Sequence, residues 1–188
     1  MTILYDDTAN LSSMSEEELT ELINLNKLCN RQRAGPWNLL SLENDYKEFY
    51  LPRSTNRVIT ARDSDYQNKL IGVLIIMSTK ESRGVAASPP LAQWFVDNSV
   101  DIEKCCIPHV FVEQNYNVAA GLFETGEAKA VELGFEDWIM YGAFEASQEE
   151  FWKNLFAGRW SAMADTDGVL IDPIPGDALP HAVRVRLV

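Results

Sequence analysis

Residues 107–144 place one helix pattern between two strand patterns, and this order restricts the fold more than any other part of the sequence. Both strand patterns, Ile107–Val112 and Asp137–Phe144, are rich in β-branched and aromatic residues. Between them, Val118–Leu133 is a helix pattern, and Gly134 suits a left-handed helix cap. Two strands joined through a helix lie parallel, with a right-handed crossover. The segment therefore predicts a parallel strand pair inside a sheet.

The residues before this segment predict an antiparallel hairpin. Arg57–Arg62 is a strand pattern, Asp63–Asn68 is a polar turn, and Lys69–Ser78 is a mostly apolar run. A strand that is apolar along its whole length has both faces buried. We therefore expect Lys69–Ser78 to be a central strand.

A helix is predicted near the N-terminus. Ser15 and Glu18 have the spacing of a capping box, and an apolar face follows them as far as about Arg33. Gly35 and Pro36 end this pattern. A second, shorter helix is predicted at Leu39–Tyr50.

The C-terminal part adds short elements. We predict a helix at Gln148–Ala157, strands at Trp160–Ala164 and Gly168–Ile171, and an alternating terminal strand at Ala182–Val188. The fold class is mixed α/β (α+β), with a mostly antiparallel twisted sheet, a central β-α-β crossover and helices on both faces. We expect a single domain over 1–188, with N-terminal helices in 1–54, an insertion at 79–106 and a C-terminal loop and strand at 173–188.

The charge of the chain excludes some partners. The formal net charge is −12, from 28 acidic and 16 basic side chains. Such a charge disfavours direct binding to nucleic acid and to anionic membrane surfaces. The sequence also lacks an apolar run of the ~18 residues that span a membrane.

The cysteines indicate a reducing compartment. There are three, and Cys105 and Cys106 are neighbours, so an intact disulfide framework is not expected. The acidic N-terminus has no basic region of a signal peptide, and we expect a cytoplasmic protein. Cys105, Cys106 and His109 have ligand chemistry but no second cluster, so we predict no metal site; buried hydrophobic cysteines are the simpler interpretation.

The turn after Val112 is the candidate functional segment. Glu113, Gln114, Asn115 and Asn117 follow the strand, and the helix begins near Ala119. The N–H groups at a helix start bind phosphate, although an ordinary strand-to-helix loop has the same composition. Glu113 is either a general base or a solvated carboxylate at a strand end.

Residues 55–172 resemble the GNAT superfamily of acyl-CoA-dependent N-acyltransferases. The resemblance is carried by the element order and by the segment Gln114–Ala119, which is similar to the family turn Q/R-x-x-G-x-G/A. Asn117 stands where the family has glycine, and Trp152 stands where many members have a tyrosine acid. The family's fourth and fifth strands splay apart to admit the pantetheine arm of the cofactor.

The resemblance implies acetyl-CoA as cofactor and an amine as acyl acceptor. It assigns catalysis to Glu113 as base, with Glu145 as a second candidate. The acid is Tyr141 or Tyr116, between which the sequence does not select. The resemblance assigns cofactor binding to Val112, Gln114, Asn117, Val118, Ala119 and Ala120.

Two functions follow. The first is an acetyltransferase. The second is a non-catalytic structural or interaction subunit on the same scaffold, for example a virion-associated phage particle component. The second would use protein contacts at the Trp94 insertion and at the C-terminal strand Ala182–Val188, since an unpaired strand docks onto another sheet.

Overall fold

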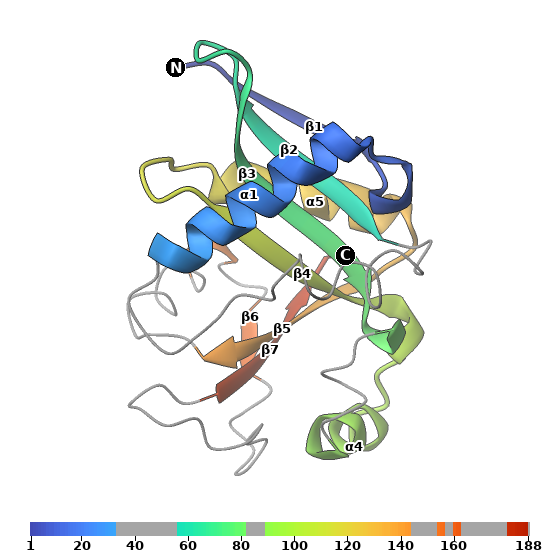
Figure 1. The fold of residues 1–188 in the computed structure, drawn as a ribbon. Helices are drawn as coiled ribbons and strands as arrows, with labels where there is room; N and C mark the ends of the chain where they lie inside the picture. Colours follow the sequence, from blue (N-terminus) through green and yellow to red (C-terminus); the bar gives the residue numbers. More distant parts are fainter. Residues whose placement is uncertain (33–55, 82–88, 144–153, 157–159, 163–179, 188) are drawn as a thin grey trace. The chain divides into compact units, whose positions relative to one another are not determined.

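The computed structural model describes residues 1–32, 56–81, 89–143, 154–156, 160–162 and 180–187 (Figure 1). The chain divides into two compact units, Met1–Met77 with His109–Lys129 and Ser78–Pro108 with Ala130–Val188. The predicted helix Leu39–Tyr50, most of the helix Gln148–Ala157 and the strand Gly168–Ile171 lie outside the described residues. The prediction of a single domain over 1–188 stays a prediction.

The first unit contains an antiparallel sheet in the order β1-β2-β3-β4. β2 (Arg57–Asp63) and β3 (Lys69–Ser78) form the predicted hairpin. The end of β4 (Cys105–Val112) follows β3 in the strand order. β1 (Ile3–Ala9) pairs antiparallel with β2 and was not predicted, because two aspartates interrupt its apolar pattern.

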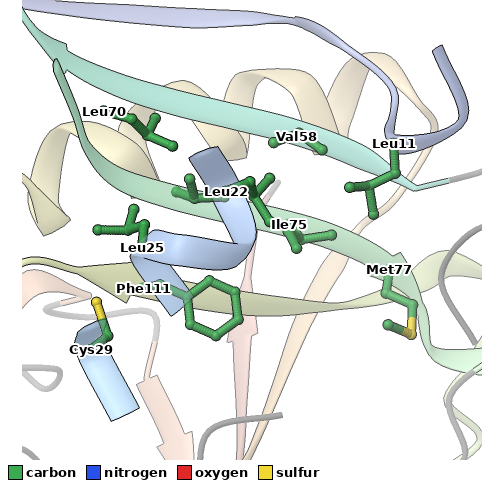
Figure 2. Close-up of a cluster of buried hydrophobic side chains, with 10 residues drawn as sticks. Leu11, Leu22, Leu25, Cys29, Val58, Leu70, Ile75, Met77 and Phe111 are labelled. Atoms are coloured by element: carbon green, nitrogen blue, oxygen red, sulfur yellow. The ribbon is translucent and has the colours of Figure 1, made fainter. Parts of the chain in front are cut away.

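Helix α1 (Glu16–Gln32) covers one face of this sheet. Its capping box is confirmed: the Ser15 N–H donates to Glu18 Oε2 at 2.8 Å, and the Glu18 N–H donates to Ser15 Oγ at 3.2 Å. Figure 2 shows its apolar side chains over those of the strands. The buried cluster contains Leu11, Leu22, Leu25, Cys29, Val58, Leu70, Val73, Ile75, Met77 and Phe111.

A β-bulge in β3 links this helix to the end of β4. Ala61 pairs with Gly72 and Arg62 pairs with Leu70, so Ile71 is an extra residue on β3. The Leu70 N–H donates to the Glu21 carboxylate of α1 at 3.2 Å. The Ile71 carbonyl accepts from the Glu113 N–H at 2.9 Å. Both backbone groups at the bulge therefore have partners outside β2.

Helix α5 (Ala119–Glu132) lies on the opposite face of β2 and β3 (Figure 1). The close approach of α5 to β3 depends on Gly72, because a Cβ at this position would lie 2.9 Å from Val118 Cγ2 and 3.0 Å from Leu122 Cδ1. The helix ends at Gly134, whose φ of +88° confirms the predicted left-handed cap. The Phe135 N–H donates to the Ala130 carbonyl at 3.0 Å and the Gly134 N–H to the Val131 carbonyl at 2.9 Å, as in a Schellman motif.

The second unit contains the predicted parallel pair. β5 (Asp137–Ala143) runs parallel to the start of β4, with Cys105 opposite Asp137 and Cys106 opposite Trp138. Among the described residues this pairing does not extend to Ile107 or Pro108. Pro108 has no N–H to donate to a ladder. With the hairpin and the helices above, this pair confirms the predicted mixed α/β fold class.

The predicted C-terminal strand is β7 (Pro180–Arg186), and it lies between β5 and β6 (Trp160–Ala162). Val185 pairs with Trp138 on one side and with Trp160 on the other. The expectation that this strand is unpaired is therefore wrong, because the whole of Pro180–Arg186 pairs with β5. Its role as a partner contact stays a prediction. Arg184 holds β7 further, donating to both carboxylate oxygens of the buried Asp137 at 2.7 and 2.9 Å.

The insertion forms helix α4 (Pro89–Asp97). Phe95 is buried and Val96 is exposed. Phe95, next to Trp94 in this insertion, therefore does not belong to an exposed contact surface. The Trp94 side chain lies outside the described residues, so its role as a partner contact stays a prediction. In the part of the chain that the structure describes, no helix has the length and apolar character needed to cross a membrane.

We expect Gly72→Ala to destabilise the protein by about 1–3 kcal/mol, because the new methyl group would overlap buried side chains of α5. Gly121→Ala is the matched control. A Cβ there would lie 2.3 Å from the ring end of Tyr5, but Tyr5 is an exposed side chain that can rotate away from the helix. We therefore expect a change of about 0.5 kcal/mol or less. Urea unfolding measures both. Equal losses in the two variants would contradict the packing argument.

Candidate functional site

Glu113 directly follows β4, and the fold holds both its backbone and its side chain. Its N–H binds the Ile71 carbonyl at the bulge. Its two carboxylate oxygens lie 2.7 and 2.8 Å from Nζ of Lys69, the first residue of β3. The Glu113 side chain is 11% exposed and that of Lys69 is 36% exposed. The carboxylate is therefore enclosed by the protein, while its partner lies closer to solvent.

Two tyrosines surround the same ammonium group. Lys69 Nζ lies 5.6 Å from the ring centre of Tyr116, in the turn after β4, and 6.0 Å from that of Tyr66, in the hairpin turn. Rings at such distances attract a cation. The hydrogen bond to Glu113 is the main cause that raises the pKa of Lys69, so the lysine is protonated at neutral pH.

Lys69 was not predicted as a site residue. Its partner is 44 residues away, and no local spacing connects the two. The sequence did contain one indication, because Lys69 is a charged residue at the start of an otherwise apolar strand. In an antiparallel pair, the start of one strand lies beside the end of the other. Had β3 and β4 been assigned as antiparallel neighbours, Lys69 and Glu113 would have been predicted to meet.

The turn itself spans residues 113–118. The Tyr116 N–H donates to the Glu113 carbonyl at 3.0 Å, and the Leu122 N–H donates to the Val118 carbonyl at 3.0 Å. Asn117 stands where the family has a glycine, but it does not have the left-handed conformation that favours one. Among the described non-glycine residues, positive φ occurs at Gln67, Asn68 and Ser99.

The predicted cofactor-binding residues divide by exposure. Gln114, Asn117 and Ala120 are exposed, whereas Val112 and Ala119 are half-buried. Val118 is buried, and its side chain faces Gly72 of the sheet. A role for Val118 in binding is therefore restricted to its backbone.

This turn fits a phosphate group at the start of α5. The first N–H groups of a helix have no acceptor within the helix, and the first turn of α5 carries no acidic residue. Lys69 adds a cation in contact with the turn through Tyr116. A concave nest of N–H groups needs a left-handed residue, and the turn lacks one in the described structure. A phosphate would thus be held by the helix start and by side chains.

The predicted acid, Tyr141, lies in β5, where its backbone pairs with Ala182 of β7. Its side chain and those of Glu145 and Trp152 lie outside the described residues. The structure therefore brings Glu113 together with the residues around Asn117 within the first unit. The catalytic role of Tyr141 stays a prediction.

The two cysteines of β4 are buried, and His109 is half-buried. All three cysteines of the chain are buried and free. Burial, followed by the charge of Asp137, raises the pKa of Cys105 to about 12, and burial raises the pKa of Cys106 well above its usual value. Burial lowers the pKa of His109 to about 4. Among the described residues, no group of three or more His, Cys, Asp or Glu side chains is arranged to hold a metal ion.

No protein-family model matches the sequence, and no curated protein matches it. The fold is nevertheless that of the GNAT acetyltransferases, as the sequence predicted. Similar structures include FeeM, an N-acyl amino acid synthase from uncultured soil microbes, with a TM-score of 0.64 and 10% identity over 99% of this chain and 92% of that one.

Two further structures share the fold. The protein yncA from Salmonella typhimurium, solved with acetyl-CoA, gives a TM-score of 0.62 at 9% identity over 99% of this chain and 94% of that one. An N-acetyltransferase from Staphylococcus aureus Mu50 gives 0.58 at 10% identity over the full length of both chains. At these identities the similarity shows the fold alone.

We expect the thiols of the native protein to resist an aromatic disulfide reagent at about pH 8, because the reactive thiolate is disfavoured by burial. In concentrated urea all three should react at the rate of free cysteine. Absorbance of the released thiolate measures both states. A native thiol that reacts at the unfolded rate would contradict the buried placement of the cysteines.

Protonation of His109 should weaken the fold as pH falls. Its pKa is lower in the folded protein than in the unfolded chain, so the unfolded chain binds the proton first. The free energy of unfolding begins to fall below about pH 6.5, and the loss is complete near pH 4. At pH 5 the loss amounts to about 1–2 kcal/mol.

The test is urea unfolding at several pH values. His109→Gln should flatten this part of the profile relative to the unmodified protein. His181→Gln, which removes the other histidine, is the control. If the free energy of unfolding changes with pH equally in the His109 variant and in the unmodified protein, the fold does not hold His109 as a neutral imidazole.

Proposed function

We propose that the protein is a CoA-dependent N-acyltransferase that transfers an acetyl group to an amine. The observation that supports this most is the β4–turn–α5 segment. It combines an enclosed carboxylate, Glu113, with a helix start that suits a phosphate and with a neighbouring cation, Lys69. The GNAT fold supports the same proposal.

Bound acetyl-CoA would supply a thioester whose acyl carbon accepts an amine nucleophile. Three kinds of group are proposed to hold its phosphates. They are the exposed side-chain amides of Gln114 and Asn117, the backbone N–H groups of Ala119 and Ala120, and the ammonium group of Lys69. Glu113 would accept the proton of the amine, directly or through one water molecule. As the new C–N bond forms and the C–S bond of the thioester breaks, Tyr141 is proposed to give a proton to the thiolate sulfur that leaves.

We place this activity in the cytoplasm. A reducing cytoplasm agrees with three free, buried thiols. The amine acceptor is not restricted further by the described residues. The alternative function, a non-catalytic subunit of a larger particle, would keep the fold but need neither a base nor a cofactor.

The test begins with calorimetric titration of acetyl-CoA, followed by measurement of thiol release with a panel of amines. We expect micromolar to millimolar binding. Glu113→Gln should lower the rate of transfer by about 10²–10⁴-fold while binding is retained, since the change removes a general base.

Glu136→Gln is the matched control. Glu136 also sits next to a strand and forms an ion pair with a lysine, Lys104, but lies in the second unit. Its substitution should leave transfer unchanged. Absence of binding at millimolar acetyl-CoA would overturn the proposal and favour the non-catalytic subunit. Binding without transfer to any amine would favour a protein that has kept the cofactor and lost the chemistry.

A further inference from the structure

The proposed base is occupied by another residue. Nζ of Lys69 donates a hydrogen bond to Oε1 of Glu113 at 2.8 Å and lies 2.7 Å from Oε2, which is buried and accepts no hydrogen bond from the described residues. An ammonium group this close to both oxygens keeps an incoming amine from reaching either of them. If Glu113 acts as a base, Lys69 has to move away first.

Lys69 is able to move. It is three times as exposed as Glu113, at 36% against 11%, and its ammonium group is carried on a flexible stem. The rings of Tyr116 and Tyr66 attract a cation without fixing its direction. Tyr116 immediately precedes Asn117 and the start of α5, where a phosphate is proposed to bind. The ammonium group thus has an anion on one side and a proposed anion site nearby.

We propose that Lys69 exchanges partners when the cofactor binds, leaving Glu113 for a phosphate group of CoA and so exposing the base after the acyl donor has arrived. This inference rests on the proposed function. It makes Lys69 a positioning residue for Glu113 and a phosphate ligand in the cofactor complex. No bond other than the hydrogen bonds changes in this step. A doubly charged phosphate competes well with one carboxylate for an ammonium group.

The exchange predicts opposite effects for the two partners. In the free protein Glu113 competes with the cofactor for Lys69. Glu113→Gln, which keeps the shape of the side chain and removes its charge, should therefore tighten CoA binding about three- to tenfold. Lys69→Met, which keeps the apolar stem, should weaken it about tenfold. The double variant should bind CoA like Lys69→Met, because the ammonium group for which Glu113 and the phosphate compete is then absent.

The measurement is calorimetric titration of CoA at low and physiological salt. Pantetheine, which carries no phosphate, is the second probe, and neither substitution should change its affinity. Lys129→Met is the matched control: this lysine also forms an ion pair in the first unit, with Asp7 at 3.6 Å, and should not alter CoA binding. Thermal unfolding of each variant confirms that it is folded.

The outcomes are distinct. Tighter binding by Glu113→Gln with weaker binding by Lys69→Met supports the exchange. Weaker binding by both variants overturns it, since the ion pair would then only shape the turn, while the proposed function survives. Equal effects on CoA and pantetheine also overturn it. Absence of CoA binding by the unmodified protein and by Glu113→Gln overturns the proposed function, and the exchange falls with it.

Discussion

The close contact between α5 and β3 at Gly72 determines where the candidate site lies. Val118 and Leu122 occupy the space that any side chain at residue 72 would need. Val118 is also the residue whose carbonyl begins the hydrogen bonding of the helix. The first turn of α5 is therefore anchored to the sheet by the residue that ends the β4–α5 turn. Cores are packed too densely to absorb even one extra methyl group at such a point.

In this strongly acidic chain, several cations of the described residues form ion pairs with single carboxylates. Arg62 binds Glu21 and joins the hairpin to α1, Lys129 binds Asp7 and joins α5 to β1, and Arg184 binds Asp137 within the second unit. These pairs connect elements far apart in the sequence. Lys69 and Glu113 differ in that their pair borders a turn with exposed polar residues. The proposed change of partner would supply a positive charge locally, so that anion binding would not need a positive net charge on the protein.

Elements with a clear period could be predicted from the sequence. The apolar run of β3, the Ser15–Glu18 capping box and the glycine at the end of α5 each depend on local chemistry, and each is confirmed. β1 was missed because an edge strand need not be apolar along its length. The role of Lys69 and the φ of Asn117 were missed for another reason: they depend on strand pairing and on the backbone of a turn. Neither leaves a pattern in neighbouring residues.

The extra residue at Ile71 has a consequence for how such a chain tolerates insertions and deletions. A bulge places an extra residue opposite a single partner, so Leu70 still lies opposite Arg62 and Gly72 opposite Ala61, as in a regular strand. Deletion of Ile71 would therefore leave Leu70 facing the cluster with α1 and Gly72 facing Val118. It would, however, remove the carbonyl that accepts from the Glu113 N–H. The extra residue thus serves the contact with the end of β4 rather than the alternation of the strand.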